Sequence, residues 1–183
     1  METAESVDVQ FREFVAARSA ALHRAAYLLT GNWATAEDLV QTALTKTYLA
    51  WKRHGEIGSV EAYARRVLYT TNASWWRRRS SGEKPTETIP ELTPAPGDTA
   101  EDTVRRDLMW RYVLTLPKRQ RAVLVLRFYE DLSEADAAHI LGVSAGTIKS
   151  QCSRALSNLR AKMSTDGMQS LTDVVSPVDG RAA

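Results

Sequence analysis

The chain has 183 residues, of which 44% are hydrophobic and 25% charged, and its formal net charge is +2. This is the composition of a globular protein, without the roughly 18 consecutive apolar residues of a membrane span, and the acidic N-terminus METAESVDVQ lacks the apolar core of a secretory signal. A single cysteine and three scattered histidines exclude an internal disulfide and argue against a metal site. No phosphate-binding glycine loop or nucleophile motif is present, so we expect a cytoplasmic protein that is not an enzyme and needs no cofactor.

Two helices are predicted first along the chain. Apolar residues recur at spacings of three and four from Phe11 to Leu29, and this pattern stops at Gly31. The second helix is predicted to open at Thr35, where Asp38 three residues later resembles a capping box. Its apolar side carries Val40, Leu44, Tyr48 and Trp51.

A third helix is predicted from about residue 60 to residue 79, with Ser59 as its N-cap. One face is apolar, and the other combines cations, an amide and aromatic rings: Arg65, Tyr69, Asn72, Trp76 and Arg79. Such a face can hold phosphates and stack on unpaired bases, each stacked base contributing about 1–3 kcal/mol. A solvated basic face explains this helix alone equally well.

Residues 80–100 contain four of the six prolines and carry four acidic side chains against one basic side chain. This segment is predicted to be a flexible linker. It separates two modestly basic blocks, residues 1–79 with a net charge of +3 and residues 101–163 with +4. We therefore expect an all-α protein of two small helical domains, at 8–79 and 101–163, with a disordered tail at 164–183.

The second block is predicted to form helices near 102–115, 117–130, 133–141 and 145–162. Pro117 is placed as a helix-starting proline and Ser133 as an N-cap. The last two helices are typical of a helix-turn-helix, in which Gly142 adopts a conformation that other residues resist and Val143 plugs the angle between the helices.

The last helix has an apolar stripe formed by Ile148, Cys152, Leu156, Leu159 and Met163. Cys152 is accordingly interpreted as a core residue and not as a reactive thiol. The surface outside the stripe is polar and basic: Thr147, Lys149, Ser150, Gln151, Ser153 and Arg154. A recognition helix presents such N-terminal residues to the major groove, so this helix is predicted to read duplex DNA.

Both blocks resemble one family, the short, extracytoplasmic-function group of bacterial sigma-70-related sigma factors, over roughly residues 8–163. The stretch ATAEDLVQTALTKTYLAW resembles region 2.2, and EAYARRVLYTTNASWWRRR resembles regions 2.3 and 2.4. A third stretch resembles region 4: LTLPKRQRAVLVLRFYEDLSEADAAHILGVSAGTIKSQCSRALSNLR. Their order, with a proline-rich linker between them, makes the combination highly specific.

The resemblance implies a function in transcription initiation, with core RNA polymerase and promoter DNA as partners. The clamp helices of the polymerase β′ subunit would be contacted by Asp38, Gln41 and Thr45. The −10 element would be melted and held by residues of the loop and the third helix: His54, Glu56, Ser59, Arg65, Tyr69, Asn72, Trp76 and Arg79. The −35 element would be read by Thr147, Lys149, Ser150, Gln151 and Arg154.

Further partners follow from the same resemblance. The region 4 domain would also sit on the β flap, and an inhibitory anti-sigma factor would be a separate protein. The acidic linker would follow the path toward the active site and RNA exit. Its 21 residues reach at most about 70 Å, the length of roughly 20 base pairs, so two DNA-binding modules on one tether can address two separated elements.

Two rival interpretations remain at the level of sequence. The chain could be a two-domain regulator whose helix-turn-helix binds duplex DNA as a dimer without polymerase. It could also be an interaction protein or enzyme with a helical ligand site, although no pattern of histidine, cysteine or paired acidic residues supports that reading.

Overall fold

The computed structural model describes residues 2–55, 57–78 and 99–168, and their side chains except those of residues 2–5, 76–78 and 102. All regular elements in this described part are helices and none is a strand, which confirms the predicted all-α fold. The elements in chain order are α1 (Glu2–Thr30), α2 (Trp33–His54), α3 (Val60–Arg78), α4 (Ala100–Leu114), α5 (Lys118–Leu124), the π-helical η1 (Val125–Tyr129), α6 (Glu134–Leu141) and α7 (Ala145–Thr165).

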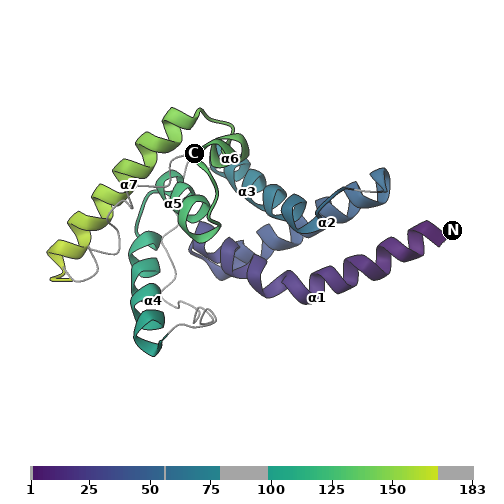
Figure 1. The fold of residues 1–183 in the computed structure, drawn as a ribbon, viewed down its shortest axis with the longest axis horizontal. Coiled ribbons are helices and arrows are strands. Elements are labelled where there is room, and N and C mark those ends of the chain that lie inside the picture. The colour runs from purple at the N-terminus through teal and green to yellow at the C-terminus, as the bar shows by residue number, and fades with distance from the viewer. Residues whose placement is uncertain (1, 56, 79–98, 169–183) are drawn as a thin grey trace.

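We call residues 2–78 the N-terminal half and residues 99–168 the C-terminal half. In Figure 1 α1 runs to one side of the molecule and α7 to the other, with α5 between them. The predicted linker lies outside the described residues up to residue 98, and the predicted tail from residue 169. The predicted division into two domains stays a prediction.

The turn between α1 and α2 is set by a glycine and an asparagine. Gly31 has a positive φ of 70°, and its N–H donates to the Tyr27 carbonyl at 2.7 Å. The side chain of Asn32 then accepts a hydrogen bond from the Thr35 N–H at 3.0 Å. The predicted start at Thr35 was therefore wrong by two residues, because Asn32 and not Thr35 supplies the cap.

The end of α2 and the start of α3 are set by residues next to them in the sequence. Lys52, Arg53 and His54 occupy the last turn of α2, where cations interact favourably with the helix dipole. Gly55, at φ 73°, donates its N–H to the Trp51 carbonyl and ends the helix. The predicted cap of α3 is confirmed, since Ser59 Oγ accepts from the Ala62 N–H at 3.3 Å.

The three helices of the N-terminal half pack through small residues. Five alanines are at most 1% exposed: Ala25, Ala26, Ala36, Ala43 and Ala64. With only a methyl group on each, the backbones of α1, α2 and α3 can approach closely. Larger apolar side chains, among them Leu39 and Leu68, fill the remaining space and are fully buried.

The C-terminal half departs from prediction between residues 117 and 130. Pro117 is the N-cap of α5 and not its first helical residue, and the helix widens into the π-helical η1 after Leu124. The Glu130 N–H consequently donates to the Val125 carbonyl, five residues back, at 3.0 Å. Apolar spacing over one turn does not distinguish an α-helix from a π-helix, so the sequence analysis missed this widening.

The helix-turn-helix forms as predicted in most respects. Ser133 caps α6 by accepting from the Asp136 N–H at 3.0 Å, and Gly142 ends that helix in the left-handed conformation, at φ 67°. The role predicted for Val143 was wrong, because its side chain is 42% exposed and does not plug the helix angle. Helix α7 continues to Thr165, three residues beyond its predicted end.

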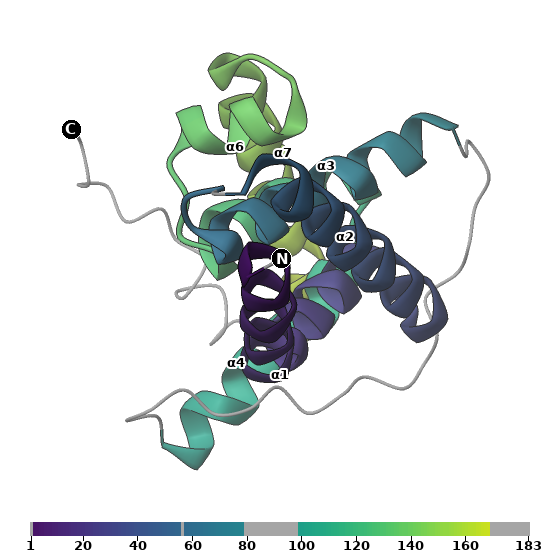
Figure 2. The same cartoon turned by 90° about the vertical axis from the view of Figure 1, so that its right-hand side faces the viewer.

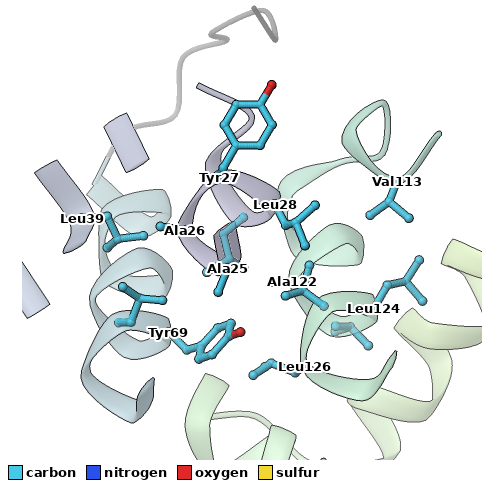
Figure 3. Packing of buried hydrophobic residues seen from close by; sticks show 14 of the residues in the cluster. Ala25, Ala26, Tyr27, Leu28, Leu39, Tyr69, Val113, Ala122, Leu124 and Leu126 are labelled. Atoms are coloured by element: carbon cyan, nitrogen blue, oxygen red, sulfur yellow. The ribbon is translucent and has the colours of Figure 1, made fainter. Parts of the chain in front are cut away.

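One continuous hydrophobic core joins the two halves. Figure 3 shows Ala25 and Leu28 of α1 between Tyr69 of α3 on one side and Ala122 and Leu126 of the C-terminal half on the other. Helix α6 of the C-terminal half also packs against α3, and Figure 2 shows the molecule from the side on which α1 begins.

Arg121 of α5 lies at this junction and is only 3% exposed. Its guanidinium donates to the Leu114 carbonyl at 3.0 Å and, at 3.4 Å, to the Thr30 carbonyl at the end of α1. Burial lowers the pKa of Arg121 to about 10, so the side chain still carries its charge at neutral pH. The buried cation therefore links the C-terminal half to the α1–α2 turn.

This geometry predicts an unusually strong effect of Gly31→Ala. A Cβ at this position would lie 3.1 Å from Arg121 Nη1, and that group is held in place by its hydrogen bonds. We expect a loss of about 2–4 kcal/mol in the free energy of unfolding, measured by urea denaturation. The matched control is Gly142→Ala, which has a similar φ but nothing within 4 Å of the added methyl group, and which should cost about 1 kcal/mol. Equal losses would show that Arg121 does not constrain the turn.

Candidate nucleic-acid and polymerase interfaces

The exposed face of α2 carries the residues predicted to contact polymerase. Asp38, Gln41 and Thr45 are all exposed, whereas Leu39, Val40 and Leu44 point into the core. Leu49 lies eleven residues after Asp38, close to three helical turns, so it continues the same face. Its side chain is 57% exposed. We add Leu49 to the candidate face. The sequence analysis missed this residue because an isolated leucine in a helix is normally interpreted as a core residue.

The loop between α2 and α3 presents two of the predicted −10 residues. His54 and Ser59 are exposed, and Gly55 and Gly58 both adopt a positive φ, of 73° and 64°. Glu56 and Arg79 lie outside the described residues, as does the side chain of Trp76.

Of the remaining predicted −10 residues, on α3, two are buried and one is partly covered in this conformation. Tyr69 is 1% exposed and Asn72 is 3% exposed, and Arg65 is half-buried. The expected polar outer face of α3 is therefore covered, because this helix packs against α2 on one side and against the C-terminal half on the other. The Asn72 amide nitrogen is buried and has no hydrogen-bond partner among the described residues.

Glu130 of the C-terminal half accepts hydrogen bonds from both Arg65 and Tyr69 of α3. Its Oε2 accepts from Arg65 Nη1 at 2.8 Å, and its Oε1 accepts from the Tyr69 hydroxyl at 2.8 Å. Burial, followed by the nearby Glu130 charge, raises the pKa of Tyr69 well above its usual range, so the hydroxyl stays a donor. Partial burial opposes protonation of Arg65, but its hydrogen bond to Glu61 and the charge of Glu130 raise its pKa overall.

The N-terminal turn of α7 has the surface expected of a reading helix. Ser144 caps the helix by accepting from the Thr147 N–H at 3.1 Å. Thr147, Lys149, Ser150 and Arg154 are exposed and Gln151 is partly buried. The apolar stripe predicted for this helix is confirmed, with Ile148, Leu159 and Met163 at most 2% exposed. Burial raises the pKa of the Cys152 thiol, in keeping with a packing role.

Gly146 in the first turn of α7 is not there to avoid crowding. A Cβ at this position would meet only Ser144 Oγ, at 3.8 Å, which is ordinary contact. A crowded helix start therefore does not explain a glycine at this position.

A cavity of about 140 Å³ lies where the helix-turn-helix meets the N-terminal half. Thr147 and Gln151 of α7 line it together with Ala73 of α3. Two predicted −35 residues thus lie next to the helix that carries the predicted −10 residues. The exposed face of α2 contributes no residue to this cavity.

Neither a candidate metal site nor a candidate membrane-spanning helix is found in the part of the chain that the structure describes. Within it, no three histidine, cysteine or acidic side chains are grouped so that they could hold a metal ion. None of the described helices combines the length and the apolar character that crossing a bilayer requires.

Comparison with known proteins places these surfaces in a family. Residues 14–82 match the model of sigma-70 region 2, and residues 106–159 match the model of sigma-70 region 4. The RNA polymerase sigma-E factor of Streptomyces coelicolor is 41% identical over 85% of this chain and 86% of its own length. The ECF RNA polymerase sigma factor SigM of Mycobacterium tuberculosis is 30% identical over 75% of this chain and 69% of its own.

Solved structures agree with the sequence relatives. The sigma factor RpoE from Bartonella quintana, crystallised in complex with the anti-sigma factor NepR, aligns with a TM-score of 0.60 at 29% identity, over 86% of this chain and 98% of its own. CnrH, in complex with the cytosolic domain of CnrY, has the same fold, with a TM-score of 0.53 at 20% identity over 90% of this chain and 94% of its own. The chain therefore belongs to the sigma-70 family of RNA polymerase sigma factors, in its extracytoplasmic-function group.

Proposed function

We propose that this sigma factor divides promoter recognition among three surfaces. The exposed face of α2 docks on the β′ clamp helices of core polymerase through Asp38, Gln41 and Thr45, extended by Leu49. The α2–α3 loop and α3 melt and hold the −10 element. The N-terminal turn of α7 reads the −35 element, while the region 4 domain rests on the β flap. The chain itself supplies no catalytic group, because bond formation belongs to the polymerase.

The observation that carries this proposal is the surface of α7. Its cap orders the first turn, its apolar stripe is buried, and Lys149, Ser150 and Arg154 are exposed on the remaining face. Lysine and arginine side chains reach guanine and phosphate, and hydroxyl groups add further hydrogen bonds in the major groove.

The same proposal covers partners and location. We propose that the protein works with polymerase in the cytoplasm and that a separate anti-sigma factor controls it. Support for the second point comes from RpoE, which was crystallised with the anti-sigma factor NepR.

Transcription from start sites in a genomic promoter pool tests the function directly. Core RNA polymerase with the protein added should produce promoter-dependent transcripts, and core polymerase alone should not. Lys149→Ala and Arg154→Ala should each lower the use of −35-dependent promoters by about tenfold, since a good base or phosphate contact contributes roughly 1–3 kcal/mol. The matched control is Arg111→Ala, because Arg111 is an exposed cation of α4 outside the reading helix. Absence of promoter-dependent transcripts, together with duplex binding by a free dimer, would overturn the sigma function.

Binding to core RNA polymerase should depend on the exposed face of α2. Asp38→Ala and Leu49→Ser should each weaken the affinity for core polymerase by about tenfold, as expected for residues in the centre of an interface. Neither side chain is part of the core, so the melting temperature should stay unchanged. Glu37→Ala removes the same charge from an exposed neighbour on α2 and serves as the control. Losses of core binding of the same size in Lys149→Ala or Arg154→Ala would contradict the division of roles.

Gly146→Ala tests whether the backbone at the start of α7 approaches DNA. The added methyl group meets nothing closer than 3.8 Å, and alanine favours a helix over glycine by about 0.5–1 kcal/mol. We therefore expect unchanged or higher stability but about fivefold weaker use of −35-dependent promoters, the effect of losing roughly one hydrogen bond. Unimpaired promoter use would show that no phosphate comes close to this position.

A further inference from the structure

The cavity beside α7 is built almost entirely by the C-terminal half. Apart from Ala73 of α3, the residues that line it belong to α5, to the end of α6 and the turn after it, and to α7. Val123 and Ile148 form a wall that is at most 2% exposed, and Leu141 and Val143 add further apolar surface. The volume is about 140 Å³. An engineered apolar cavity of about 150 Å³ holds benzene, so this cavity has room for a single aromatic ring.

Two polar side chains without partners line the same cavity. Arg119 is exposed and Gln151 is partly buried, and the side chain of neither makes a hydrogen bond or an ion pair with another residue that the structure describes. The hydroxyl of Thr147, by contrast, is already engaged, because its Oγ1 lies 2.8 Å from Ser144 Oγ. A mostly apolar cavity on which a few polar groups converge is the usual form of a small-molecule site. The guanidinium and the amide are therefore the groups available to a ligand.

The charge of Arg119 selects an anion. Its guanidinium is always protonated, and its planar fork of N–H groups matches a carboxylate through two parallel hydrogen bonds. Among the described residues, no acidic side chain lines the cavity and competes for this cation. Because Arg119 is exposed while Val123 and Ile148 are buried, the charge lies at the mouth of the cavity and the apolar surface at its bottom. A ligand with an apolar ring and an attached carboxylate satisfies both ends.

We propose that this cavity binds a small aromatic carboxylate, with the ring against Val123 and Ile148 and the carboxylate on Arg119, and that the bound acid weakens reading of the −35 element. The second part rests on the function proposed above for Thr147 and Gln151. Both residues line the cavity, so a ligand held there covers them and places a negative charge beside the surface that DNA phosphates approach. Ligand and duplex therefore oppose each other's binding, by the same factor in both directions.

Sodium benzoate is the probe for the binding site. It is titrated into the full chain with labelled isoleucine, leucine and valine methyl groups, which are followed by NMR. The signals of Val123, Val143 and Ile148 should shift in a saturable way, with a Kd of about 1 mM or tighter for a ligand of this size. Benzamide, which keeps the ring but lacks the charge, should bind at least about tenfold more weakly. Acetate, which lacks the ring, should shift none of these signals.

Three variants identify the groups that bind. Arg119→Gln removes the charge at an exposed position and should weaken benzoate binding at least about tenfold. Lys118→Gln is the matched control, because it removes the same charge from a neighbour that does not line the cavity, and the Kd should stay unchanged. Val143→Phe, at a position that is 42% exposed, places a ring at the cavity wall and should abolish the shifts while circular dichroism shows a folded chain.

Two results would overturn the binding site. One is the absence of saturable methyl shifts at benzoate concentrations about tenfold above the expected Kd. The other is an equal Kd in Arg119→Gln and Lys118→Gln, since the carboxylate would then not lie on Arg119.

Transcription tests the effect on −35 reading. With benzoate at about ten times its Kd, use of −35-dependent promoters should fall at least about threefold relative to the same concentration of acetate, and Arg119→Gln should lose this sensitivity. Equal transcription in the two salts would contradict the proposed effect. The NMR titration contains neither polymerase nor DNA, so a failure of the sigma function would appear separately, as missing transcripts in acetate with the methyl shifts intact.

Discussion

The arrangement of this sigma factor depends on a carboxylate that is nearly removed from water. Glu130 must be paired wherever it is buried, and the only donors that it reaches among the described residues belong to α3. That requirement brings the end of η1 against Arg65 and Tyr69 and, with it, α6 and the start of α7 against the N-terminal half. Arg121 is a second buried charge, at the α1–α2 turn, where its guanidinium donates to two carbonyl groups and its Nε has no hydrogen-bond partner among the described residues.

Helix α3 consequently belongs to the core of one half and to the contact with the other half. Its fully buried Ala64 and Leu68 belong to the core of the N-terminal half, while Arg65 and Tyr69 contact the C-terminal half. The same helix carries the residues proposed to hold the −10 strand, so the two uses exclude each other in one conformation. The unpaired amide nitrogen of buried Asn72 fits this conflict, because an unsatisfied buried donor costs roughly 1–3 kcal/mol and a nucleic-acid ligand could satisfy it.

Local signals in the sequence predicted the helices well and their edges less well. Ser59, Ser133 and Gly142 ended or started helices as expected, because caps and left-handed glycines act through neighbouring backbone groups. Asn32 was overlooked in favour of Thr35, since both residue types cap helices and only the geometry selects one. The π-helical widening at η1 was missed because it changes the position of Glu130 without changing the apolar pattern that signals a helix.

By itself the sequence determined the family, the all-α fold, the helix-turn-helix and the polar surface of α7, because all of these depend on spacing and residue type within short segments. Only the tertiary structure decided that Tyr69 and Asn72 are buried, that Leu49 is exposed and that Glu130 faces Arg65. The contact of Glu130 depends on which surface of one half meets the other, and the exposure of Leu49 depends on how α2 packs against α1 and α3. Residues 65 and 130 are far apart in the chain, and no local pattern encodes the contact between them.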